Sequence, residues 1–134
     1  RRKLQARLTE IIDSAAAQTE LLQGFVACWD ASDGFTAGHT LYELSCGIIG
    51  QGVQGVPWCE RWLRAVAEKV WLGASLRERV GELSEVATVE QAGRSYKLTL
   101  RPEASLDQLE AALAPILPGA EDWQAAVRRL YGRG

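Results

Sequence analysis

A chain of 134 residues is long enough to bury the core of one domain without disulfide bonds. Its hydrophobic content of 47% and charged content of 24% are those of an ordinary globular protein, which excludes a disordered chain. The formal net charge of −2 excludes a strong overall attraction to nucleic acid or to an anionic membrane. We therefore expect a single domain over residues 1–134.

Cysteine spacing and hydropathy favour a cytoplasmic protein. Cys28, Cys46 and Cys59 cannot all pair, and they are too far apart for a zinc knuckle or a redox Cys-x-x-Cys motif. We expect buried thiols in a reducing compartment, and we predict no metal and no cofactor. No apolar run approaches about 18 residues and no basic-then-apolar leader is visible, so we expect no membrane partner.

The first predicted element is a helix whose apolar stripe ends before Gly24. Phe25 to Trp29 is then a short apolar run bounded by turn residues, which predicts a buried strand. Asp30 to Gly34 predicts a turn, because Asp and Ser bond nearby backbone N–H groups and Gly takes positive φ. Phe35 to Gly38 is a candidate for a very short second strand. The helical stripe consists of Leu4, Leu8, Ile11, Ile12, Ala15, Thr19 and Leu22.

A helix and a glycine-rich connector are expected next. Thr40 to Glu43 has the Thr-x-x-Glu pattern of a capping box, and the helix that it opens should end near Gly50. We expect residues 50–56 to form a flexible connector inside the domain. The glycines of Gly47 to Gly55 also suggest a phosphate loop. A Walker loop needs Lys-Ser/Thr after its last glycine, however, and here valine and proline follow.

Residues Pro57 to Gly73 carry the strongest helix signal in the chain. Proline suits the first helical position, and glycine suits the residue after the last turn. Most apolar and charged side chains between them separate onto opposite sides at helical spacing. At about 100° per residue, Trp71 falls among the charges on the exposed side of the helix, which makes it the candidate interface residue. The alternative is that it covers the apolar end of its own helix against Leu76 or Val80. The predicted inward residues are Trp58, Cys59, Trp62, Leu63, Val66, Ala67 and Val70.

A β-hairpin is predicted over about residues 85–101. Before it, the pattern Ser75-x-x-Glu78 predicts a capping box and a short helix to about Leu83. Residues 95–101 alternate apolar and polar side chains, as a half-exposed strand does. Residues 85–90 are the predicted antiparallel partner, joined through a turn at residues 91–94. Pro102 closes the second strand because it removes a backbone donor.

Two helices complete the predicted fold. Ser105-x-x-Gln108 is a third capping box, and the helix that it opens should end at Pro115. An apolar stripe from Trp123 to Tyr131 predicts the last helix. The elements together predict an α+β fold, namely a predominantly helical single domain with a small antiparallel sheet.

Candidate ligand-binding residues cluster in the turn after the first strand and in the connector. Two carboxylates, Asp30 and Asp33, could hold Mg²⁺ with a phosphorylated ligand, although their spacing differs from that of a calcium loop. His39 is the only histidine, and nothing in the sequence places it beside a cysteine. A self-stabilised turn and a polar helix-entry residue are the simpler interpretations. The candidate ligand-binding set is Asp30, Asp33, His39, Gly50 and Gly52.

The order of the predicted elements resembles that of known small adaptor domains. Over about residues 4–114, with its best local point at Val26 to Phe35, it resembles the roadblock family of small dimeric regulators of GTPases. One central strand of that family is missing from the predicted order, and the glycine-rich connector has no counterpart. Leu44 to Leu100 is also similar to the helix–helix–hairpin half of vinyl-reductase-like and vesicle-tethering adaptor domains. Both resemblances imply binding rather than chemistry.

We therefore expect a non-catalytic protein-interaction or regulatory module that forms a homodimer with an apolar contact near Trp71. The alternative is a small-ligand binding protein or enzyme for a phosphorylated metabolite or nucleotide, using the Asp30–His39 turn and the Gly47–Gly55 connector. Nucleic-acid binding is disfavoured, because the final helix offers few basic or amide side chains for base edges.

Overall fold

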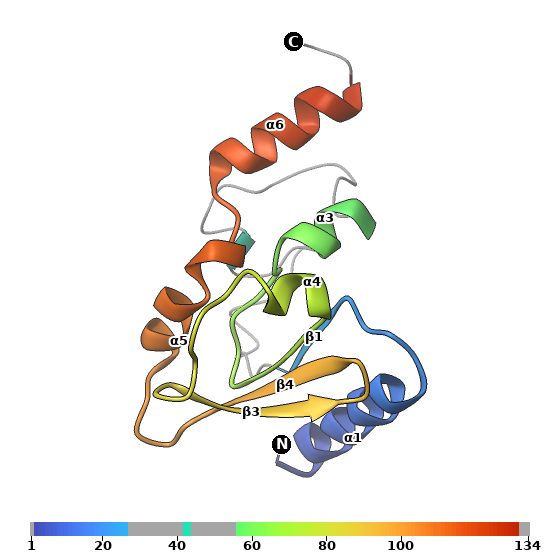
Figure 1. Cartoon of the computed structure of the whole chain (residues 1–134), viewed down its shortest axis with the longest axis vertical. Helices are drawn as coiled ribbons and strands as arrows, with labels where there is room; N and C mark the ends of the chain where they lie inside the picture. The colour runs from blue at the N-terminus through green and yellow to red at the C-terminus, as the bar shows by residue number, and fades with distance from the viewer. Residues whose placement is uncertain (1, 27–41, 44–55, 132–134) are drawn as a thin grey trace.

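The computed structural model describes residues 2–26, 42–43 and 56–131, and these form an α+β fold (Figure 1). The predicted fold class and the antiparallel hairpin are confirmed. In chain order the elements are α1 (Arg2–Gln18), β1 (Gln23–Val26), α3 (Val56–Arg61), β2 (Lys69–Leu72), α4 (Ala74–Arg77), β3 (Ala87–Ala92), β4 (Ser95–Leu100), α5 (Leu106–Ala112), the 3₁₀ helix η2 (Ala114–Ile116) and α6 (Ala120–Tyr131).

The four strands form one antiparallel sheet in the order β1-β2-β4-β3. Strand β2 lies between β1 and β4, so both of its edges are hydrogen-bonded. Val70 stands opposite Phe25 on one neighbour and Leu98 on the other, whereas Trp71 stands opposite Gly24 and Lys97. Because successive side chains of a strand point to opposite faces, Val70 and Trp71 serve two different cores.

The larger core fills the face of the sheet that α4 and α5 cover. Figure 1 shows α1 on the other side of the sheet and α6 at the far end of the molecule from α1. Alternate strand positions supply this larger core, such as Val70 and Leu72 of β2, because successive side chains point to opposite faces. Its buried residues are Leu63, Ala67, Val70, Leu72, Leu76, Val80, Leu83, Ala87, Leu98, Leu109, Leu113 and Ile116.

The predicted helix over Pro57–Gly73 is wrong beyond its first turns. Helix α3 ends at Arg61, and β2 occupies the C-terminal part of the same segment. The Leu63 N–H donates to the carbonyl of Ile116 at 2.7 Å instead of continuing the helix. A short run that is apolar nearly all round fits a buried strand as well as a helix. Pairing on both edges of β2 decides in favour of the strand.

Trp71 is therefore buried rather than exposed. Its side chain is 0% exposed, and it packs against Ala16 and Val26 beneath α1. Its indole N–H donates to a carboxylate oxygen of Asp13 at 3.1 Å. The expectation that Trp71 lies on an exposed helix face is wrong, and the reason for assigning it to an interface disappears with it.

The predictions from turn and capping residues are confirmed at the hairpin and at α5. Gly93 has φ 61° in the two-residue turn between the paired Ala92 and Ser95, as the hairpin requires. The capping box is present at α5. The Ser105 hydroxyl accepts from the Gln108 backbone N–H, and the Gln108 side-chain oxygen accepts from the Ser105 backbone N–H. A helix is also found where the last one was predicted.

The predicted capping box at Ser75 is wrong. Helix α4 begins at Ala74 after Gly73, and no side chain caps its start. Ser75 lies inside the helix, and its hydroxyl donates instead to the Glu60 carbonyl at 3.5 Å. Position 73 requires glycine because the backbone of Leu21 packs closely against it, and not because the residue is left-handed. An added Cβ would lie 2.6 Å from the Leu21 carbonyl oxygen.

Candidate functional site

Helix α1 presents an apolar stripe to solvent. Its prediction as a helix is confirmed, but the helix ends at Gln18 and the predicted stop, Gly24, lies in β1. About half of the expected core stripe also faces outward. Leu4, Leu8 and Ile11 are 62%, 41% and 64% exposed. At about 100° per residue, this stripe lies roughly 120° around the helix from the side that faces the sheet. The sheet-facing side consists of Thr9, Ile12, Asp13 and Ala16.

Polar contacts and close packing hold α1 in place. Asp13 accepts a hydrogen bond from the Trp71 indole and forms a 2.8 Å ion pair with Lys97, whose ammonium also lies 5.4 Å from the Trp71 ring centroid. A Cβ on Gly93 would lie 2.0 Å from the Ala16 carbonyl oxygen, and one on Gly24 would lie 3.3 Å from an Ile12 methyl group. The exposed stripe is therefore presented by a helix that is packed tightly onto the sheet.

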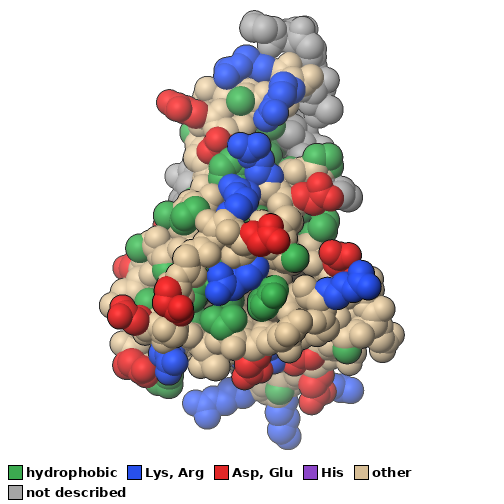
Figure 2. Space-filling model, in the orientation of Figure 1, with side chains coloured by type: hydrophobic (Ala, Val, Ile, Leu, Met, Phe, Trp, Pro, Cys, Tyr) green, Lys and Arg blue, Asp and Glu red, His purple; other side chains and the backbone are tan. Residues whose placement is uncertain are grey.

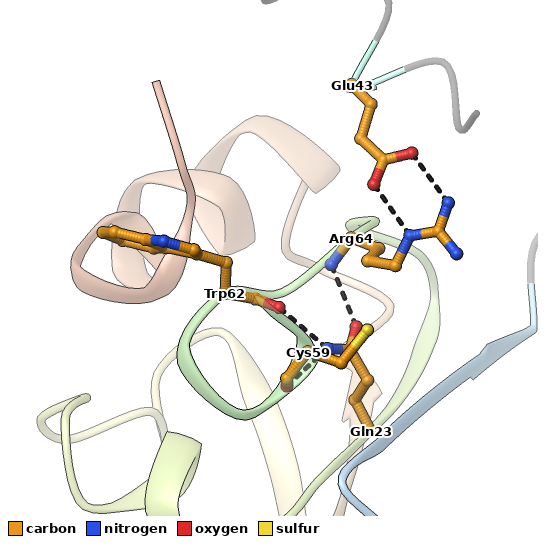
Figure 3. Close-up of polar contacts among 5 residues, drawn as sticks. All are labelled: Gln23, Glu43, Cys59, Trp62 and Arg64. Atoms are coloured by element: carbon orange, nitrogen blue, oxygen red, sulfur yellow. Dashed lines mark hydrogen bonds and ion pairs between the residues drawn. The ribbon is translucent and has the colours of Figure 1, made fainter. Parts of the chain in front are cut away.

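A polar cluster lies at the C-terminal end of α3 (Figure 3). The Gln23 side-chain amide donates to the carbonyls of Cys59 (2.9 Å) and Trp62 (2.7 Å). Its oxygen accepts the Arg64 backbone N–H at 2.9 Å. The last carbonyls of a helix lack hydrogen-bond donors within the helix. The Gln23 side-chain amide, which belongs to strand β1, takes the place of the backbone N–H donors that a further helical turn would have provided.

Arg64 extends the same cluster to a buried carboxylate. Its guanidinium donates to both oxygens of Glu43, at 2.7 and 3.0 Å, and Glu43 is 0% exposed. The hydrogen bond to Glu43 raises the pKa of Arg64, which outweighs the lowering by burial. Two-point pairing of this kind fixes geometry as well as charge. The cluster therefore ties residues 42–43, β1 and α3 together.

The Cys59 thiol is poorly suited to nucleophilic chemistry. Burial raises its pKa, the Arg64 charge lowers it, and Glu43 raises it again, with a raised pKa as the result. A reactive cysteine needs the opposite, because the thiolate is the nucleophile. The cluster around Cys59 therefore stabilises the fold by joining distant segments, and it does not provide a nucleophile.

An aromatic cluster joins α3 to α6. Trp58 lies 6.3 Å from Trp62 and 5.4 Å, edge to face, from Trp123, measured between ring centroids. The guanidinium carbons of Arg61 and Arg79 lie 5.3 and 5.0 Å from the Trp62 ring centroid. Sequence reasoning placed Trp58 and Trp62 in the core but missed both arginines, because Arg79 is brought to Trp62 only by the tertiary fold.

An open groove of about 550 Å³ runs between Tyr42 and α5. The Tyr42 hydroxyl donates to the Pro118 carbonyl at 3.1 Å, and Asp107 and Glu110 supply the charged part of the lining. Two carboxylates disfavour a phosphorylated ligand, because like charges repel. The groove therefore gives no support to the binding of phosphorylated metabolites.

The candidate ligand-binding residues Asp30, Asp33, His39, Gly50 and Gly52 lie outside the described residues, as do nearly all of the expected connector over residues 50–56 and its flanks. Across residues 2–26, 42–43 and 56–131, no group of three or more His, Cys, Asp or Glu side chains could hold a metal ion. No helix in this part of the chain has the length and apolar character needed to span a membrane.

Comparisons with protein-family models, curated proteins and solved structures find no match for this chain. The resemblance to the roadblock family consequently rests on the order of predicted elements alone. The most distinctive features on the described surface are the outward stripe of α1 and the arginine-flanked Trp62.

Proposed function

We propose that this protein is a non-catalytic interaction or regulatory module that forms a homodimer through helix α1. One observation carries the proposal, namely that Leu4, Leu8 and Ile11 form a single exposed apolar stripe on a helix that is already packed onto its own sheet. Exposed large apolar side chains gathered on one face indicate a contact surface, whereas scattered ones do not.

The spacing of the stripe suits a pair of helices. Intervals of four and then three residues match the alternation that places side chains along a coiled-coil seam. Arg2, Lys3 and Arg7 make the start of α1 cationic, so a parallel pair would bring these charges together. An antiparallel pair across a two-fold axis separates them and opposes the two helix dipoles.

The expected affinity is modest. Fully burying a Leu or Ile side chain is worth about 1.5–3 kcal/mol, so covering the exposed parts of these three contributes about 2.5–5 kcal/mol per copy. Lost translational and rotational freedom costs about 4–15 kcal/mol. A contact limited to one helix is also smaller than a standard interface. At the favourable end of these ranges, we therefore expect a dissociation constant of roughly tens to hundreds of micromolar.

Sedimentation velocity from about 1 to 500 μM tests the proposal, because this range spans the expected constant. The wild-type protein should change from monomer to dimer with concentration. Ile11→Glu should remain monomeric, because it places a charge in the seam. The matched control is Leu106→Glu, since Leu106 is 43% exposed on α5 and away from the stripe. A wild-type monomer at all concentrations, or equal effects of the two variants, would refute dimerisation through α1.

The small-ligand alternative depends on the Asp30–His39 turn and the Gly47–Gly55 connector. No observation on the described part of the chain favours it, and it stays a prediction from sequence.

A further inference from the structure

Two arginines share Trp62, the tryptophan that directly follows helix α3. The guanidinium groups of Arg61 and Arg79 both approach the half-buried Trp62 ring within cation–π distance. The ring attracts each cation through its quadrupole but carries no charge of its own. Two positive charges therefore remain beside a half-buried aromatic surface.

No carboxylate of the described residues neutralises this pair. Ion pairs within that part of the chain involve Arg64, Arg94 and Lys97, but not Arg61 or Arg79. The Arg79 guanidinium instead donates to the backbone carbonyls of Arg61 and Pro115. These bonds hold the Arg79 guanidinium in position while leaving its charge uncompensated.

The positive charges of Arg61 and Arg79 repel each other. Burial lowers the pKa of Arg79, and the positive charge of Arg61 lowers it further. An anion placed beside both guanidinium groups would relieve this repulsion and could accept two-point hydrogen bonds, for which the guanidinium fork is suited.

Further basic side chains lie on α6. Arg128 and Arg129 lie exposed in the last turns of α6, which packs on α3 through the contact between Trp123 and Trp58. Figure 2 shows several Lys and Arg side chains on this face between α6 and α4, with Asp and Glu side chains among them. We call Arg61, Trp62, Arg79, Arg128 and Arg129 the arginine surface.

We propose that the arginine surface docks an acidic segment of a partner protein, with Asp or Glu carboxylates bound by Arg61 and the α6 arginines. This goes beyond self-association, since α1 lies at the opposite end of the molecule (Figure 1). A nucleic acid is the competing polyanion, and the oligonucleotide arm of the test below separates the two ligands.

Fluorescence anisotropy with a fluorescein-labelled octaglutamate peptide at low salt tests this proposal. The wild-type protein should bind the peptide, and the affinity should fall as salt is added. Arg61→Ala should weaken binding about fivefold, which corresponds to the upper end for a partly exposed ion pair. The matched control is Arg94→Ala on the hairpin turn, because its side chain is 81% exposed and its loss changes the net charge equally. This control should stay within about twofold of the wild type.

Three results would overturn the proposal. The first is an absence of salt-sensitive binding by the wild-type protein, and the second is an equal loss in Arg61→Ala and Arg94→Ala. The third is tighter binding of a labelled oligonucleotide with the same number of charges, which would assign the surface to nucleic acid. Circular dichroism of Arg61→Ala should match that of the wild type, since this side chain is exposed. Ile11→Glu should retain peptide binding, which separates this test from that of the dimer.

Discussion

Replacing Gln23 with leucine tests whether one side chain of the sheet ends helix α3. The Gln23 amide satisfies the carbonyls of Cys59 and Trp62 and the backbone N–H of Arg64, at 2.7 to 2.9 Å. Leucine is similar in size but makes none of these bonds. The substitution therefore leaves three backbone groups without their partner while changing the packed volume little.

The expected loss of stability depends on the number of backbone groups left without a partner and on how deeply they are buried. A buried backbone group without a partner costs about 1–3 kcal/mol. Gln23 is only half-buried, so water can reach part of the cluster and reduce that cost. We expect the free energy of unfolding to fall by about 2–4 kcal/mol, with a decrease in Tm of about 8–16 °C for a chain of this size.

Urea unfolding followed by tryptophan fluorescence measures the change, because Trp58 and Trp62 adjoin the cluster. The matched control is Gln124→Leu, an exposed glutamine on α6, which should change stability by less than about 0.5 kcal/mol. If Gln23→Leu also stays within about 0.5 kcal/mol of the wild type at an unchanged m value, the capping role of Gln23 is refuted.

Two further perturbations test the position of α1 and the state of the cysteine. Gly93→Ala should lower the free energy of unfolding by more than about 2 kcal/mol, because it combines a positive φ with an overlap on the Ala16 carbonyl. Gly81→Ala, whose added Cβ would meet nothing within 4 Å, should be neutral in the same denaturant titration, and equal losses would contradict the close packing of α1. Because its pKa is raised, Cys59 should react with iodoacetamide more slowly than a free cysteine at neutral pH and accelerate only as pH rises above the ordinary thiol range. Mass spectrometry of the labelled peptide measures this rate, and fast labelling at neutral pH would contradict a protonated thiol.

Local patterns predicted the elements whose signals are complete within a few residues. The hairpin follows from alternation in β4 and from Gly93, which alone supplies the left-handed turn residue at low cost. The capping box at α5 could be predicted because its two members, Ser105 and Gln108, belong to the same helix start. In each case both interacting groups lie close in sequence, so the sequence pattern contains the whole interaction.

The segment after Pro57 shows where such patterns fail. Its apolar side chains fit helical spacing, but Val70, Trp71 and Leu72 also fit a strand buried on both faces. Whether β2 forms depends on the edges of β1 and β4, which come from distant parts of the chain. The outward position of Leu8 could not be predicted either. Periodicity shows that a helix has an apolar side, but not which side packs on the sheet.

The amino-acid sequence by itself determined the α+β class, the hairpin, the first and last helices and the capped helix α5. The tertiary structure decided the central strand β2, the burial of Trp71, the exposed stripe of α1 and the meeting of Arg79 with Trp62. The physical reason is the range of the interactions. Turns, caps and periodicity act between neighbours in sequence, whereas strand pairing and the choice of buried face depend on partners that only folding brings together.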